Sequence, residues 1–166
     1  LVKVFEKEIA VTDSIYAWLV GPVSVLKNWD YHTSENSIAT TLAIEWGQRL
    51  QPAIFRTKVI DDDEADIVTI TNQFAATATA KDLLPVLLET IKDLQNRFGR
   101  WQLPWGEINR FQRISADIEN KFDDSKPSIP VGFASSAWGM LPSYTSRTYP
   151  GTNKRYGVNG NSFIAV

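Results

Sequence analysis

Apolar side chains recur every three to four residues along two stretches of the chain, the spacing that places them on one face of an α-helix. The clearer stretch predicts a helix over residues 82–98, with Asp82 as N-cap, Pro85 in the first turn and Gly99 as a left-handed stop. Its apolar stripe consists of Leu84, Leu87, Leu88, Ile91, Leu94 and Phe98. Such a stripe must be buried against other elements, so we expect a folded, mainly α-helical protein.

The second stretch predicts a helix over residues 34–51, with Thr33 or Ser34 as its N-cap and Pro52 ending it. Its apolar face consists of Ile38, Ala39, Leu42, Ala43, Trp46 and Leu50.

Two weaker patterns predict further helices. Residues 13–29 are expected to form a helix that is interrupted at Gly21–Pro22. A helix over about 106–122 is suggested by the spacing of Ile108, Phe111, Ile114, Ile118 and Phe122.

The composition changes near Pro127. All 19 acidic residues lie in 1–126, whereas 127–166 contain no acidic residue and are rich in proline and glycine, which is typical of loops and short strands. We predict a helical domain over 1–126 and a loop-rich tail over 127–166 that ends in a strand at Ser162–Val166. Because the chain starts at Leu1 without an initiator Met and stops inside this β-prone run, we expect it to be an internal piece of a longer protein.

Composition excludes several classes of function. The formal net charge is −2 at pH 7 and basic residues do not cluster, which argues against a nucleic-acid partner. The absence of cysteine excludes disulfides, thiolate metal sites and a cysteine nucleophile. Apolar runs are far shorter than the roughly 20 residues that span a bilayer, and no signal peptide is recognisable, so we expect no membrane association.

His32 is the single histidine, so a His-based catalytic triad or metal site would have to include it. The chain has neither G-x-S-x-G nor H-E-x-x-H, and His32 directly precedes a predicted helix. We therefore expect an ordinary role for His32 and no metal site.

An acidic run, Asp61–Glu64 with Asp66, resembles a calcium loop only superficially. The EF-hand pattern requires Gly at the sixth position and Glu at the twelfth, where this chain has Asp66 and Asn72. We interpret the run as a solvated surface loop, with weak cation binding as the alternative.

Six tryptophans could form a stacking surface for sugars, although helical spacing favours the core for most of them. They are Trp18, Trp29, Trp46, Trp101, Trp105 and Trp138. The glycine-rich segment Gly157–Ser162 does not follow G-x-G-x-x-G and precedes a predicted strand, so a phosphate site is not expected there.

Three stretches together resemble, in order and spacing, the penicillin acylase (penicillin amidase) family of N-terminal-nucleophile hydrolases, and within it the acyl-homoserine-lactone acylase-like branch. The resemblance extends over nearly the whole chain. The stretches are Leu26–Asp30 with Glu35–Thr40, then Pro104–Arg110, and finally Tyr149–Gly151 with Tyr156–Val166.

This resemblance implies an internal piece of the β chain of a larger αββα enzyme. In that family a periplasmic precursor cleaves itself, the new N-terminal Ser attacks an amide with its own α-amino group as base, and backbone and Asn groups form the oxyanion hole. The chain begins with Leu1, and its resembling segments lie downstream of the nucleophile and of the oxyanion Asn. We therefore expect no catalytic residue, cofactor or metal here, and a structural role for Asn161 and Ser162.

The resemblance also implies partners and a location. The partners would be the remaining α- and β-chain segments and a small N-acylated substrate of β-lactam or acyl-homoserine-lactone type, in the periplasm or outside the cell. Trp105, Glu107 and Arg110 are candidates to line the substrate site or to support it. The alternative for these residues is a buried Glu–Arg pair that holds a loop.

Two other functions remain open from the residues alone: a standalone helical protein-interaction module without catalysis, and a sugar-binding domain. For the acylase interpretation, we expect the 166-residue chain to be inactive by itself.

Overall fold

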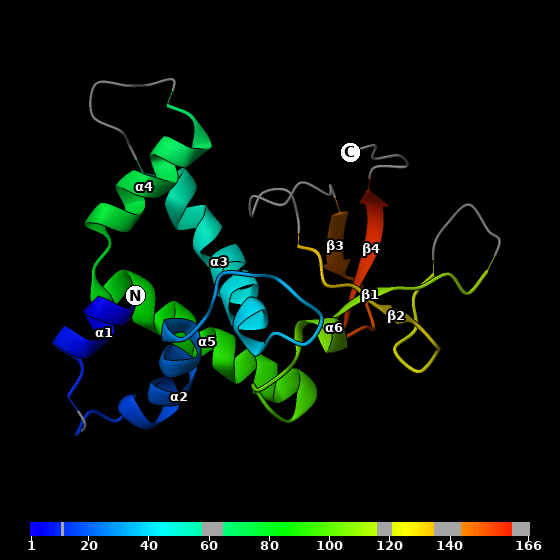
Figure 1. Ribbon diagram of the computed structural model, residues 1–166, viewed down its shortest axis with the longest axis horizontal. Coiled ribbons are helices and arrows are strands. Elements are labelled where there is room, and N and C mark those ends of the chain that lie inside the picture. Colours follow the sequence, from blue (N-terminus) through cyan, green and yellow to red (C-terminus); the bar gives the residue numbers. More distant parts are fainter. Residues whose placement is uncertain (11, 58–64, 116–120, 135–143, 161–166) are drawn as a thin grey trace. The chain divides into compact units, whose positions relative to one another are not determined.

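The computed structural model describes residues 1–10, 12–57, 65–115, 121–134 and 144–160 (Figure 1). About 52% of the chain is helical and a small mixed sheet lies toward its C-terminal end, which confirms the mainly α prediction. Among the helices of the described ranges, none combines the length and the apolar character needed to cross a membrane. The chain divides into two compact units, which we describe separately.

The first unit, Leu1–Asn28 with Glu45–Asp93, is built from helices. It contains α1 (Val2–Glu8), α2 (Tyr16–Lys27), α4 (Ile67–Thr77) and the parts of α3 (Ile38–Phe55) and α5 (Ala80–Phe98) that fall in these ranges. Its buried apolar side chains are Phe5, Leu19, Val23, Leu50, Leu83, Leu84, Leu87 and Ile91. Helix α5 supplies half of these side chains, and α1, α2 and α3 supply the rest.

The structure confirms the stripe and the end of the predicted helix 82–98. Leu84, Leu87, Ile91 and Leu94 are at most 2% exposed, and Gly99 follows α5 with φ of 76°. The start differs, because α5 begins at Ala80. Asp82 therefore lies inside the first turn, where its carboxylate accepts hydrogen bonds from Thr79 N (2.8 Å) and Thr79 Oγ1 (2.7 Å).

The predicted helix 34–51 is shifted toward the C-terminus. The N-cap is Ser37, whose Oγ accepts a hydrogen bond from Thr40 N at 3.0 Å, rather than Thr33 or Ser34. Pro52 does not end the helix, which continues to Phe55. A proline removes only its own N–H donor, and the last turn forms beyond it.

The interruption predicted at Gly21–Pro22 is also wrong. Helix α2 runs without a break from Tyr16 to Lys27, and Pro22 is buried inside it between Leu19 and Val23. Burial of this apolar face offsets the backbone hydrogen bond that Pro22 cannot make.

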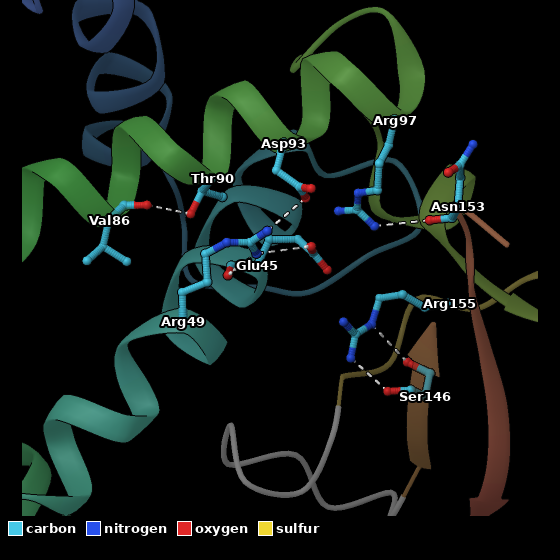
Figure 2. Close-up of polar contacts among 9 residues, drawn as sticks. All are labelled: Glu45, Arg49, Val86, Thr90, Asp93, Arg97, Ser146, Asn153 and Arg155. Atoms are coloured by element: carbon cyan, nitrogen blue, oxygen red, sulfur yellow. Dashed lines mark hydrogen bonds and ion pairs between the residues drawn. The ribbon is translucent and has the colours of Figure 1, made fainter. Parts of the chain in front are cut away.

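Polar contacts join α3 to α5 within the first unit. Arg49 Nη2 lies 2.8 Å from Asp93 Oδ2, and Arg49 Nη1 lies 3.7 Å from the carboxylate of Glu45, a residue that is 3% exposed (Figure 2). The indole N–H of Trp46 donates to Leu83 O at 3.3 Å. Charged and aromatic side chains therefore fix the packing of these two helices.

The second unit, Trp29–Ile44 with Leu94–Val166, contains a four-stranded sheet. Its strands are β1 (Asn109–Phe111), β2 (Ile129–Pro130), β3 (Tyr144–Thr148) and β4 (Arg155–Gly160). They lie side by side in the order β2-β1-β4-β3 (Figure 1). Strand β1 is parallel to β4 and antiparallel to β2, and β3 is antiparallel to β4 with an irregularity between Thr145 and Ser146.

The predicted helix over 106–122 is wrong. Among the described residues of this range, only Trp105–Ile108 form a helical turn, α6, after which the backbone enters β1 at Asn109; Ile118 lies outside the described residues. The apolar spacing that favoured a helix does not produce a buried face, since Phe111 is 48% and Ile114 42% exposed. Pairing of β1 with both β2 and β4 overrides the local pattern.

The tail contains short strands, as its composition predicts. Strand β4 reaches Gly160, while the predicted strand Ser162–Val166 lies outside the described residues. Strand β1 comes from the predicted helical domain 1–126 and pairs with strands of the predicted tail 127–166. The domain boundary near Pro127 stays a prediction.

Candidate functional site

The segments before α3 and at α6 meet through their backbones. Trp105 N donates to Ser37 O at 3.1 Å, and Gly106 N donates to Glu35 O at 2.7 Å. A Cβ added to Gly106 would lie 2.8 Å from Cβ of both Glu35 and Pro130. Gly106 therefore permits a close crossing that no other residue would allow without a shift of its neighbours.

The α6–β1 segment also contacts the C-terminal segment. In the parallel pairing of β1 with β4, Asn109 is opposite Arg155 and Arg110 is opposite Tyr156. Parts of the three stretches singled out in the sequence, Glu35–Thr40, Pro104–Arg110 and residues 156–160, thus come together in the second unit around α6 and β1. We take this region as the candidate site.

Trp105 and Asn109 hold the segment that follows β2. Trp105 is 1% exposed and its indole N–H donates to Phe133 O at 3.0 Å. Asn109 is fully buried and its Nδ2 donates to Val131 O (2.9 Å) and Phe133 O (2.8 Å). The sequence offers no local signal for this role of Asn109, because its hydrogen-bond partners lie more than twenty residues away along the chain.

Arg110 binds neutral oxygens on two sides of the site. Its Nη1 donates to Gly106 O at 2.7 Å and its Nε to Ser128 Oγ at 2.9 Å, and a third, short contact joins Nη2 to Ser128 O. These contacts connect Gly106 of α6 to Ser128, the residue just before β2.

The Glu–Arg pair expected between Glu107 and Arg110 is not formed. Both carboxylate oxygens of Glu107 instead accept hydrogen bonds from Arg100 Nη2, at 2.8 and 2.6 Å, and both side chains are about half exposed. A spacing of three residues brings side chains together only while the helix continues, and α6 ends at Ile108. Whether Trp105, Glu107 and Arg110 line a substrate site stays a prediction.

Two tyrosines pack around β4. Tyr144 Oη donates to Arg110 O at 2.8 Å, and burial raises the pKa of Tyr144 to about 12. Tyr156 is fully buried and its hydroxyl donates to Asp124 Oδ1 at 2.8 Å. Burial, and then the Asp124 carboxylate, raise the pKa of Tyr156 well above its usual value. Both hydroxyls therefore act as neutral donors rather than as bases.

Further contacts hold the turn before β4. The carboxylate of Asp124 accepts a hydrogen bond from Asn153 N at 2.6 Å, and Arg97 Nη1 donates to Asn153 O at 3.0 Å (Figure 2). Arg155 donates to Ser146 O at 2.7 Å across β3 and β4 (Figure 2). The described polar side chains around the turn before β4 therefore hold neighbouring backbone segments together.

His32 belongs to an exposed turn before α3. The side chain is 86% exposed, its Nδ1 lies 3.0 Å from Asp30 O, and its backbone N–H is bonded to Asp30 Oδ1 at 2.9 Å. Tyr31, with φ of 63°, forms the bend of the same turn. These contacts fit the ordinary role expected for His32.

Asp66 is a helix cap. Its Oδ1 accepts a hydrogen bond from Thr69 N at 2.7 Å at the start of α4, and this bond lowers the pKa of Asp66. The predicted acidic loop Asp61–Glu64 lies outside the described residues. Within the part of the chain that is described, no three His, Asp or Glu side chains gather as metal ligands.

The tryptophans do not share one environment. Trp105 is buried, Trp46 bonds to Leu83 O, and Trp18 is 43% exposed with Lys92 Nζ 5.8 Å from its ring centroid. Trp138 lies outside the described residues, as do Asn161 and Ser162.

Gly157 has a steric role in β4. A Cβ at this position would lie 2.2 Å from Tyr144 Oη, so the absence of a side chain makes room for the tyrosine ring. Packing therefore explains this glycine of the predicted Gly157–Ser162 segment.

The sequence model described as penicillin amidase matches residues 3–166 of the chain. None of the curated proteins matches it.

Proposed function

This chain belongs to the penicillin amidase family, and we propose that it is an internal part of the β chain of an N-terminal-nucleophile amide hydrolase. Membership in this family implies an acylase-like hydrolase that acts on amides. The observation that carries the proposal is the extent of the match, residues 3–166, which leaves almost no part of the chain outside the family pattern.

In the proposed mechanism a Ser outside this chain attacks the amide carbonyl of an N-acylated small molecule of β-lactam or acyl-homoserine-lactone type. Its own α-amino group serves as base, because an α-amino pKa near 7.7–8.0 lies close to operating pH. Backbone and Asn groups outside the chain stabilise the oxyanion, and water then hydrolyses the acyl-enzyme. We further propose that the parent enzyme acts in the periplasm or outside the cell.

The proposed contribution of this chain is structural support. The described hydrogen bonds of Trp105, Asn109 and Arg110 go to backbone oxygens and to the hydroxyl of Ser128. Such contacts are typical of residues that hold neighbouring segments in place. His32 and Asp66, the other polar candidates, are engaged in a turn and a helix cap. Because these polar side chains are engaged in structural contacts, we infer that the catalytic centre lies elsewhere in the parent protein.

The test uses the full reading frame that encodes this chain. We expect the purified parent protein to hydrolyse a chromogenic phenylacetyl or fatty-acyl amide, and a variant with Ala at the N-terminal Ser of its β chain to be inactive and unprocessed. The variant Ser14→Ala, at an exposed residue of this chain, is the matched control and should retain activity.

A second arm uses the isolated 166-residue chain, which should show no turnover. Turnover by the isolated chain that disappears on mutation of its own residues would overturn the proposal. A parent protein that is neither processed nor active on any acyl amide would favour the interaction-module alternative instead.

A further inference from the structure

We draw no further inference here: the strongest candidate, the exposed apolar pair Phe111 and Ile129 on one face of β1 and β2, carries none because nothing in the structure shows what covers it.

Discussion

At Gly157 a single added methyl group would collide with an aromatic ring. A Cβ there would lie 2.4 Å from Tyr144 Cζ and 2.5 Å from Cε2. We expect Gly157→Ala to displace the ring, to weaken the hydrogen bond from Tyr144 to Arg110 O, and to destabilise the protein by about 1–3 kcal/mol. Urea denaturation of the variant measures this change in the free energy of unfolding.

The control for this prediction is a double-mutant cycle with Tyr144→Ala, which removes the ring. In that background Gly157→Ala should cost much less, since the aromatic ring that the new Cβ would meet is no longer there. An equal cost in both backgrounds would show that the collision is not the cause.

Asn109 is the buried amide on which the segment after β2 depends. Asn109→Leu removes the donor to Val131 O, while Phe133 O keeps its hydrogen bond from the Trp105 indole. We expect a loss of about 1–3 kcal/mol of stability, because the part-buried Val131 carbonyl is left without its donor. Asn109→Asp, of equal size but without the two N–H donors, should be at least as destabilising; a neutral effect of both variants in thermal unfolding would contradict this role.

At the scale of single elements, helix α4 depends on an ionised cap. The hydrogen bond from Thr69 N lowers the pKa of Asp66 in the folded chain below its ordinary value of 3.8. This cap therefore stabilises α4 above pH 3.8, and the stabilisation is lost as pH falls through the lower folded-state pKa. Amide hydrogen exchange, measured at decreasing pH, should show that α4 loses protection at a higher pH than the other helices do.

Asp66→Asn is the matched control for the cap, because its amide oxygen can accept the same hydrogen bond without titrating. Its α4 should open with little dependence on acid pH, whereas Asp66→Ala should open more readily at every pH. If Asp66→Asn shows the same acid response as the natural chain, another group controls α4.

At the scale of the whole molecule, variants of the parent enzyme distinguish a structural role of Glu107 and Arg110 from contact with the substrate. Glu107→Gln breaks only a half-exposed pair with Arg100, and such pairs contribute at most about 1 kcal/mol. We expect kcat/KM to stay within about twofold of the natural enzyme, a change of under 1 kcal/mol in transition-state stabilisation.

Arg110→Ala should behave differently from Glu107→Gln. The substitution removes the hydrogen bonds from Arg110 to Ser128 Oγ and Gly106 O, so the protein should lose stability. The fraction that remains folded should keep the KM of the natural enzyme. Assays of the parent enzyme at several substrate concentrations, together with thermal unfolding, separate the two effects. A raised KM without a loss of stability would instead place Arg110 at the substrate.

The sequence by itself determined the features that depend on local periodicity: the mainly α class, the buried stripe of α5 and its stop at Gly99. Each of these is encoded by residues a few positions apart, because a helix forms its hydrogen bonds within one segment. Trp105 and Arg110 were also selected from the sequence, although their partners Phe133 and Ser128 were not.

Only the tertiary structure decided the path after Ile108 and the pairing of Glu107 with Arg100. The apolar spacing over 106–122 favoured a helix, yet β1 forms because β2 and β4, both distant in sequence, supply its hydrogen-bond partners. The same holds for Asn109, whose burial depends on carbonyls at Val131 and Phe133. Strand pairing and buried polar contacts join residues far apart along the chain, so no local pattern specifies them.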